Sequence, residues 1–185
     1  MNDNQADILL WNAFKGGDRE AFDSLFRQYY PLLLQYGARI CAEKEILEDC
    51  IQELFIETWQ SKHATEVQSV KAYLLKSLKY KLYKQLKTRQ ASSYTGGNTE
   101  EDFQFVVSHD EFIIQQEDHA RLNAKIIDAI SQLPNRQREI VYLKIYQGLS
   151  YDEISEIMNI NYQASRNLFY QSMKSMRSIW ETNHH

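Results

Sequence analysis

The sequence predicts an all-α protein with two small helical domains joined by a flexible linker, the C-terminal one containing a helix-turn-helix. Only two prolines and six glycines interrupt the 185 residues. The segments between them are rich in Leu, Ile, Lys, Glu and Gln, which suit helices better than strands. Apolar side chains also recur every three or four residues, as on one face of a helix. A chain of this length can bury one core or two modest ones.

The N-terminal half is expected to form the first domain, residues 1–90. Its apolar periodicity predicts four helices, with a glycine turn after the first of them. A proline inside the second marks a break or a kink there. The expected features are helices at 6–14, 19–41, 44–60 and 69–90, a turn at Gly16-Gly17-Asp18, a break or kink at Pro31 and a loop at 61–68.

Residues 91–111 break every helical pattern with small residues, a Gly-Gly pair and mixed polarity. Such a composition predicts the flexible linker. The short run from Phe103 to Val107 is nevertheless expected to dock on another surface, because a wholly solvated linker has no use for it.

The second domain is expected at 112–185. Ser150 and Glu153 have the spacing of a capping box, in which each side chain bonds the other residue's backbone, so a helix should start there. The chain turns at 159–161, and the last helix follows. The expected features are helices at 112–132, 135–146 and 162–180, and a packing face of Ser165, Leu168, Phe169, Met173, Met176 and Trp180 on the last.

The net charge of −4 hides a segregated distribution. Between Glu66 and Glu100 there is no acidic residue but seven basic ones, whereas residues 100–118 are strongly acidic. Tyr80 and Tyr83 lie among the lysines, and aromatic rings beside cations can stack on unpaired bases. A solvated helix face explains the lysines equally well when they are taken alone.

Tyr73 has two interpretations, since it also belongs to an apolar stripe with Leu74, Leu78 and Leu82. The last helix shows a second, polar face near its start. Long Gln, Asn and Arg side chains on such a face suit base readout in a major groove, although a solvated face would look the same.

Catalysis is not expected, because no phosphate loop, nucleophile elbow or metal-binding motif appears. Cys41 and Cys50 lack the spacing of a zinc site or a disulfide framework and are expected to be free thiols. No cofactor or metal is expected. Without a signal peptide or a long apolar run, we expect a soluble, cytoplasmic protein with no membrane span.

The stretch "LPNRQREIVYLKIYQGLSYDEISEIMNINYQASRNLFYQSMKSMR", 133–177, is similar to the fourth conserved region of a known family, the bacterial RNA polymerase sigma factors of the small, extracytoplasmic-function (ECF) type. The stretches "AFDSLFRQYYPLLLQYGARI", 21–40, and "LEDCIQELFIETW", 47–59, resemble the second region. The family pattern Glu-Asp-x-x-Gln-Glu/Asp-x-Phe appears there as Glu48, Asp49, Gln52, Glu53 and Phe55.

The resemblance implies a non-catalytic factor that binds core RNA polymerase and promoter DNA and directs promoter-specific initiation. It also implies an anti-sigma partner. The roles it implies are polymerase binding by Asp49, Gln52 and Glu53; contact with the minus-ten element by the 61–68 loop and Lys71, Lys76, Lys79, Tyr80 and Tyr83; and contact with the minus-thirty-five element by Gln163, Arg166, Asn167, Tyr170, Lys174 and Arg177.

Some positions depart from the family. Tyr73 stands where it usually has Trp, Tyr80 where it usually has Asn, and Lys84 where it often has Asp. These departures leave promoter melting and minus-ten preference open, and the unusual residues at 163–167 leave the minus-thirty-five sequence open. The alternative function is a stand-alone helix-turn-helix regulator with an N-terminal sensing or dimerisation domain.

Overall fold

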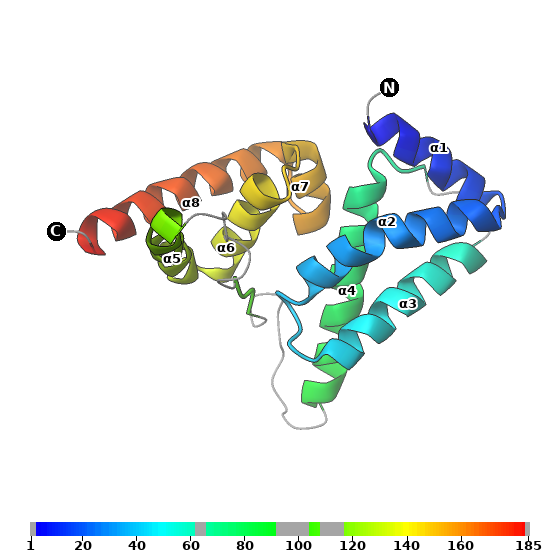
Figure 1. Ribbon diagram of the computed structural model, residues 1–185, viewed down its shortest axis with the longest axis horizontal. Helices are drawn as coiled ribbons and strands as arrows, with labels where there is room; N and C mark the ends of the chain where they lie inside the picture. Colours follow the sequence, from blue (N-terminus) through cyan, green and yellow to red (C-terminus); the bar gives the residue numbers. More distant parts are fainter. Residues whose placement is uncertain (1–2, 62–65, 92–103, 108–116, 184–185) are drawn as a thin grey trace. The chain divides into compact units, whose positions relative to one another are not determined.

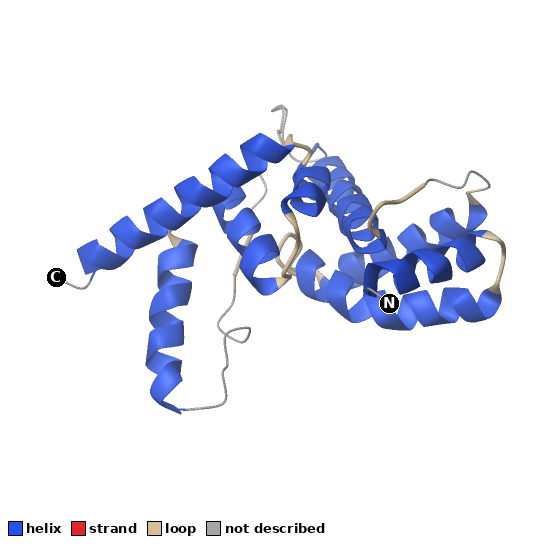
Figure 2. Cartoon of the chain, turned by 90° about the horizontal axis from the view of Figure 1, so that it is seen from above, coloured by secondary structure: helices blue, strands red, loops and turns tan. Residues whose placement is uncertain are grey.

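The computed structural model describes residues 3–61, 66–91, 104–107 and 117–183 (Figure 1). All regular structure in these ranges is helical, and they contain no strand (Figure 2). The all-α prediction is therefore confirmed. The chain forms two compact units, Met1–Asn98 and Thr99–His185, each of which is described by itself. Most of the expected linker, 92–103 and 108–111, lies outside the described residues.

The first unit contains four helices. They are α1 (Asp3–Lys15), α2 (Arg19–Gly37), α3 (Lys44–Gln60) and α4 (Val70–Ala91). The Asp18 side chain caps α2 by accepting bonds from the backbone N–H groups of Glu20 and Ala21, at 2.9 and 3.2 Å. Helix α2 continues past Pro31 and ends at Gly37, before the predicted residue 41.

Packing in the first unit is closest where α2 ends. A Cβ atom at Gly37 would lie 2.2 Å from Leu47 Cδ1 and 3.3 Å from Leu78 Cδ2. The missing side chain therefore lets α3 and α4 approach α2. The buried apolar residues of the unit include Leu25, Leu33, Tyr36, Leu47, Ile51, Leu54, Leu74, Leu78 and Leu82.

Helix α1 contacts both of the helices that flank residues 61–69 (Figure 1). Phe14, near the end of α1, packs on Trp59 in the last turn of α3, with ring centroids 5.5 Å apart. Trp11 packs edge-on against Tyr73 in the first turn of α4, with centroids 5.1 Å apart. Tyr73 is thus a half-buried packing residue, which settles its two interpretations in favour of the core.

The second unit also consists of helices. They are α5 (Glu117–Ser131), α6 (Asn135–Val141), a π-helical turn η3 (Tyr142–Tyr146), α7 (Tyr151–Met158) and α8 (Tyr162–Asn183). One regular helix was predicted at 135–146, but its second half is the wider π-helical turn. The Gln147 N–H bonds to the Tyr142 carbonyl five residues earlier, at 3.1 Å.

Residues 104–107 pack in the second unit. Phe105 and Val107 are buried, and the Phe105 ring lies edge-on to Tyr142 with centroids 5.5 Å apart. The Phe105 N–H donates to Asn135 Oδ1 at 3.3 Å. The prediction that this apolar run docks is confirmed for 104–107, whereas Phe103 lies outside the described residues.

Candidate protein-binding and DNA-binding faces

The exposed face of α3 carries all three residues expected to bind a protein partner. Asp49, Gln52 and Glu53 are exposed, and the last two follow Asp49 by three and four residues, so all three share one side of the helix. One turn further on, Ile56 is 52% exposed, so an apolar side chain lies beside these polar ones. The face is therefore acidic and polar at one end and apolar at the other.

Ile56 and Trp59 belong to a shallow hollow between α2 and α3. Arg19, Phe22 and Asp23 complete its lining. Trp59 is 37% exposed, and the sequence did not single out Ile56. Its position off the apolar stripe of α3 was the signal that could have found it. The hollow adds an apolar binding feature beside the charged one.

Basic side chains from α4 neutralise part of the α3 face. Lys81 Nζ lies 2.7 Å from Glu57 Oε1 and 3.6 Å from Glu53 Oε2. Within α3 itself, Glu48 pairs with Lys44 at 3.6 Å and accepts a hydrogen bond from the Tyr30 hydroxyl at 3.3 Å. Burial, and then the nearby Glu48 carboxylate, raise the pKa of Tyr30.

The five α4 residues expected at the minus-ten element differ in their exposure to solvent. Lys76 and Tyr80 are exposed, Tyr80 to 70%, and lie one turn apart. Lys71 and Tyr83 are half-buried. Lys79 is only 7% exposed, with its Nζ 5.6 Å from the centroid of the Tyr83 ring.

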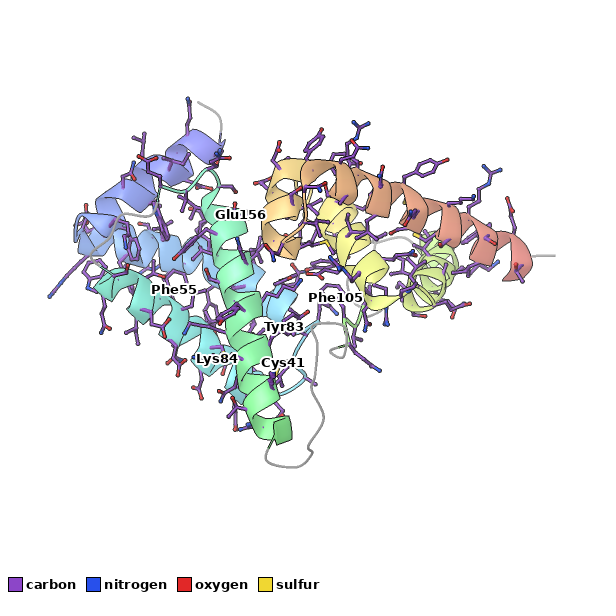
Figure 3. All side chains as sticks on the ribbon, turned by 180° about the vertical axis from the view of Figure 1, so that it is seen from behind. Cys41, Phe55, Tyr83, Lys84, Phe105 and Glu156 are labelled. Atoms are coloured by element: carbon purple, nitrogen blue, oxygen red, sulfur yellow. The ribbon has the colours of Figure 1, made fainter. Side chains whose placement is uncertain are left out.

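The exposed stripe of α4 continues beyond Tyr80 to Lys84 and Lys87. Figure 3 labels Lys84 beside Tyr83 on this helix. Sequence reasoning had included Lys79 and left out these two lysines, because it counted basic residues without fixing which side of the helix is covered. Residues 62–65 of the adjoining loop lie outside the described residues.

The second unit contains the expected helix-turn-helix. Ser150 caps α7 by accepting from the Glu153 N–H at 3.2 Å, and Glu153 Oε2 accepts from the Ser150 N–H at 2.8 Å. The capping-box prediction is confirmed. Asn159 ends α7 in the left-handed conformation, with φ of 51°. Asn161 then begins α8 by accepting from the Ala164 N–H at 2.7 Å.

Small polar groups join the two helices of this motif. Ser155 Oγ and Ser165 Oγ lie 3.1 Å apart, within hydrogen-bond distance, and Ser165 is fully buried. The Tyr151 carbonyl accepts from the Ser155 hydroxyl at 2.6 Å. Lys144 Nζ donates to the Leu149 carbonyl at 2.8 Å and lies 4.7 Å from the centroid of the Tyr151 ring. Of these contacts, the one between Ser155 and Ser165 links α7 directly to α8.

All six residues expected at the minus-thirty-five element are exposed on α8. Gln163 Nε2 donates to Asn167 Oδ1 at 3.1 Å, and the Arg177 Nε pairs with Glu181 at 2.9 Å. Arg166 and Asn167 are adjacent, and the other successive members are three or four residues apart. The full set is Gln163, Arg166, Asn167, Tyr170, Lys174 and Arg177.

The predicted packing face on α8 is wrong at one position. Met173 is 38% exposed, whereas Ser172 is buried and donates to the Leu168 carbonyl at 2.7 Å. The side of α8 that carries the buried Ser165 and the half-buried Leu168 and Phe169 continues through position 172. Apolar character had suggested Met173, but the geometry of the helix decides the choice.

Cys41 and Cys50 are buried free thiols, and burial raises the pKa of Cys50. Within the described ranges, no three His, Cys, Asp or Glu side chains are placed to hold a metal ion. A search of the same ranges finds no helix both long and apolar enough to cross a bilayer.

Two family models match the chain in consecutive segments. The model described as "Sigma-70 region 2" matches residues 25–92, and "Sigma-70, region 4" matches residues 123–176. Together they cover about two thirds of the chain. Helix α1 lies outside both matches.

Curated relatives and solved structures agree with these matches. "ECF RNA polymerase sigma factor SigK" of Mycobacterium ulcerans (strain Agy99) is 22% identical over 171 residues, covering 88% of this chain and 87% of the relative. The protein of the same name from Mycobacterium sp. (strain JLS) is 20% identical over 179 residues, covering 93% of this chain and 89% of its own.

Two solved structures share the fold. CnrH, in complex with the cytosolic domain of CnrY, has a TM-score of 0.62 and 14% identity, and covers 96% of this chain and 98% of its own. The sigma factor RpoE, in complex with the anti-sigma factor NepR from Bartonella quintana, has a TM-score of 0.59 and 18% identity, covering 86% and 96%.

A helical region 2 followed by a region 4 with a helix-turn-helix defines the class of sigma-70 promoter-specificity subunits. The chain belongs to this family. Within it, the chain is an ECF-type sigma factor, which binds core RNA polymerase and directs promoter-specific initiation. The presence of both regions leaves the alternative of a stand-alone regulator without support.

Proposed function

We propose a division of labour among three helices of this sigma factor. Helix α3 binds core RNA polymerase, α4 with the connection before it holds the minus-ten element, and α8 reads the minus-thirty-five element. The observation that carries the proposal is the exposed polar stripe of α8, because all six expected residues share one accessible side of the second helix of a helix-turn-helix.

Polymerase binding is assigned to Asp49, Gln52 and Glu53. Their exposure and common side on α3 support this role. The partner surface should be basic where it meets the carboxylates. Ile56 and Trp59 supply the neighbouring apolar contact, since interfaces gain most from side chains that fill pockets away from water.

Contact with the minus-ten element is assigned first to Lys76 and Tyr80, because both are exposed one turn apart. The Tyr80 ring can stack on an unpaired base while Lys76 neutralises a phosphate. Lys71 and Tyr83 are half-buried candidates. Lys79 requires its side chain to be uncovered before it can contact DNA.

On α8, the residues nearest the turn are proposed to read bases. Gln163 and Asn167 suit adenine, and Arg166 suits guanine, at major-groove edges. Lys174 and Arg177 lie two to four turns further along, where phosphate contact is expected. Tyr170, 73% exposed, lies between the two groups.

An anti-sigma protein is the proposed regulator. Two structures of similar fold are described as complexes, of CnrH with the cytosolic domain of CnrY and of RpoE with the anti-sigma factor NepR. A protein that covers α3 would block polymerase binding here. We place this activity in the cytoplasm and assign all catalysis to the polymerase.

The test is transcription by core polymerase reconstituted with the full chain. A promoter library with both elements randomised should yield transcripts enriched in one minus-ten and one minus-thirty-five sequence. Core polymerase alone is the control. The proposal fails if adding the protein gives no more specific transcript than core polymerase alone.

A further inference from the structure

Helix α1 is bonded to both ends of the connection between α3 and α4. Lys15 Nζ, at its last residue, donates to the carbonyls of Thr58 and Ser61 at 3.0 and 2.6 Å. Asn4 Nδ2, in its first turn, donates to the Gln68 carbonyl at 3.0 Å. One helix therefore contacts the point where the chain leaves α3 and the point just before it enters α4.

The chemistry of the Lys15 end is specific. Ser61 caps the C-terminus of α3, where carbonyls lack helical partners and the helix dipole is negative. An ammonium group can satisfy two such carbonyls at once. Partial burial lowers the pKa of Lys15, which is consistent with an ammonium group turned toward the protein.

The distance between the two anchors is set by a rigid element. Asn4 and Lys15 are eleven residues apart on α1, or about 16 Å along the helix axis at 1.5 Å per residue. Between them, Trp11 and Phe14 are buried against Tyr73 and Trp59. These aromatic contacts hold the helix in place, so the hydrogen bonds at its ends can align the two chain segments.

We propose that α1 is a positioning element for minus-ten recognition, with Lys15 and Asn4 fixing the last turn of α3 and the residues that lead into α4. This inference rests on the proposed function, in which that connection and α4 hold the minus-ten strand. Neither side chain needs to touch DNA. Their effect is on the placement of the groups that do, and placement decides which bases are accepted.

The packing of α1 separates this role from simple stabilisation. The aromatic residues bury the apolar surface of the helix, whereas Asn4 is exposed and Lys15 is half-buried. Removing the polar groups leaves the aromatic contacts intact. Both acceptor sets are backbone carbonyls, so the contacts are tested by changing the donors.

The experiment uses the full chain with core polymerase and a promoter library randomised at the minus-ten element, with a fixed minus-thirty-five element. Open complexes are sequenced for the unaltered protein and for Lys15→Met, which keeps the length of the side chain and removes its charge. We expect the preference for the favoured minus-ten base to fall about fivefold, equivalent to one hydrogen bond of about 1 kcal/mol.

Three further variants complete the design. Lys15→Arg can still donate to two carbonyls and should restore the preference to within about twofold of the original. Asn4→Ala, at an exposed position, should reduce the preference by about twofold and gives a test independent of Lys15. Lys44→Met, which removes an exposed lysine paired with Glu48, is the matched control and should change nothing.

The outcomes separate the two proposals. If the unaltered protein shows no minus-ten preference, the proposed function fails and this inference fails with it. If that preference is present and survives both Lys15→Met and Asn4→Ala, the positioning role alone is overturned. A loss of minus-ten preference with unchanged polymerase affinity and unchanged minus-thirty-five preference supports it, whereas an equal loss at both elements overturns it.

Discussion

The two domains present their proposed contact groups in different ways. In the first, the relevant side chains come from adjacent helices and pair with one another, as Lys81 of α4 does with Glu53 and Glu57 of α3. In the second, α8 alone carries the proposed DNA contacts, and from Tyr162 to Trp180 it contains no acidic residue. A substitution at such a pair in the first domain therefore affects both the α3 face and the α4 face, whereas a substitution on α8 affects a single face.

This contrast explains how a protein with a net charge of −4 can bind DNA. For DNA binding, the charge of the contact surface matters more than the net charge of the chain. Carboxylates on α3 offset the lysine run of α4, whereas the reading face of α8 keeps its positive charge until Glu181. We expect the salt dependence of DNA binding to be simpler for α8 than for α4, because salt also weakens the ion pairs of Lys81 on α4.

The largest expected effect tests whether the α3 face is separate from α8. The double change Gln52→Lys and Glu53→Lys should weaken core-polymerase binding at least about thirtyfold, or about 2 kcal/mol, because it puts two cations against a basic partner surface. Fluorescence anisotropy of labelled protein measures it. Binding of minus-thirty-five DNA should stay unchanged.

Glu43→Lys is the control for that double change, because Glu43 immediately precedes α3 and pairs with Arg89 of α4 at the N-terminal end of the helix. It should retain polymerase affinity. Retention of full affinity by the double variant would mean that α3 is not the polymerase contact.

The next prediction tests whether the two units fold independently. Gly37→Ala places a Cβ atom against Leu47 and should lower the free energy of unfolding of the first unit by about 1–3 kcal/mol. Calorimetry of the full chain should show one transition moving to lower temperature. The transition of the second unit serves as an internal control, and a shift of both would show that they unfold together.

Two changes on α8 sharpen the assignment of base readers and phosphate contacts. Arg166→Ala should relax preference at one base pair by about 1–3 kcal/mol, because a base-edge contact is lost. Lys174→Ala should weaken binding equally for all sequences and reduce the salt slope by about one contact. Titrations of cognate and altered DNA over a salt series measure both. Equal losses for all sequences from Arg166→Ala would contradict its role in readout.

The smallest expected effect concerns the start of α7. Ser150→Ala removes the cap and should lower the free energy of unfolding of the second unit by about 1 kcal/mol. Glu153→Gln should cost less, because an amide can still accept the bond from the Ser150 N–H. Thermal unfolding compares the two variants. A larger loss from Glu153→Gln would show that its charge, and not the capping bond, stabilises the helix.

Sequence reasoning succeeded where local chemistry decides the structure. The capping box at Ser150, the turn at Asp18 and the range 44–60 of α3 depend on residues a few positions apart, and each was predicted correctly. The all-α class follows from periodicity in the same way. The exposure of Asp49 and of the α8 stripe follows from helical phase.

Features set by distant residues were not predicted. The burial of Lys79 and the π-helical turn after Val141 depend on neighbours brought together by folding. The error at Met173 is different, because the helical phase of α8 already places Ser172 on the buried side. Lys15 bonds to Thr58 and Ser61, which lie 43 and 46 positions further along the chain. No spacing in the sequence predicts contacts over such separations. A basic residue at a helix end is common, and the carbonyls it will meet cannot be read from it.

The acceptors of Lys15 and Asn4 are main-chain carbonyls, which every amino acid supplies. Side chains between Ser61 and Gln68 can therefore be replaced without removing the bonds that attach α1. With the function proposed for this connection, promoter preference can then diversify during evolution, or in an engineered set of orthogonal transcription factors, by exchange of this short segment while its supports are inherited unchanged.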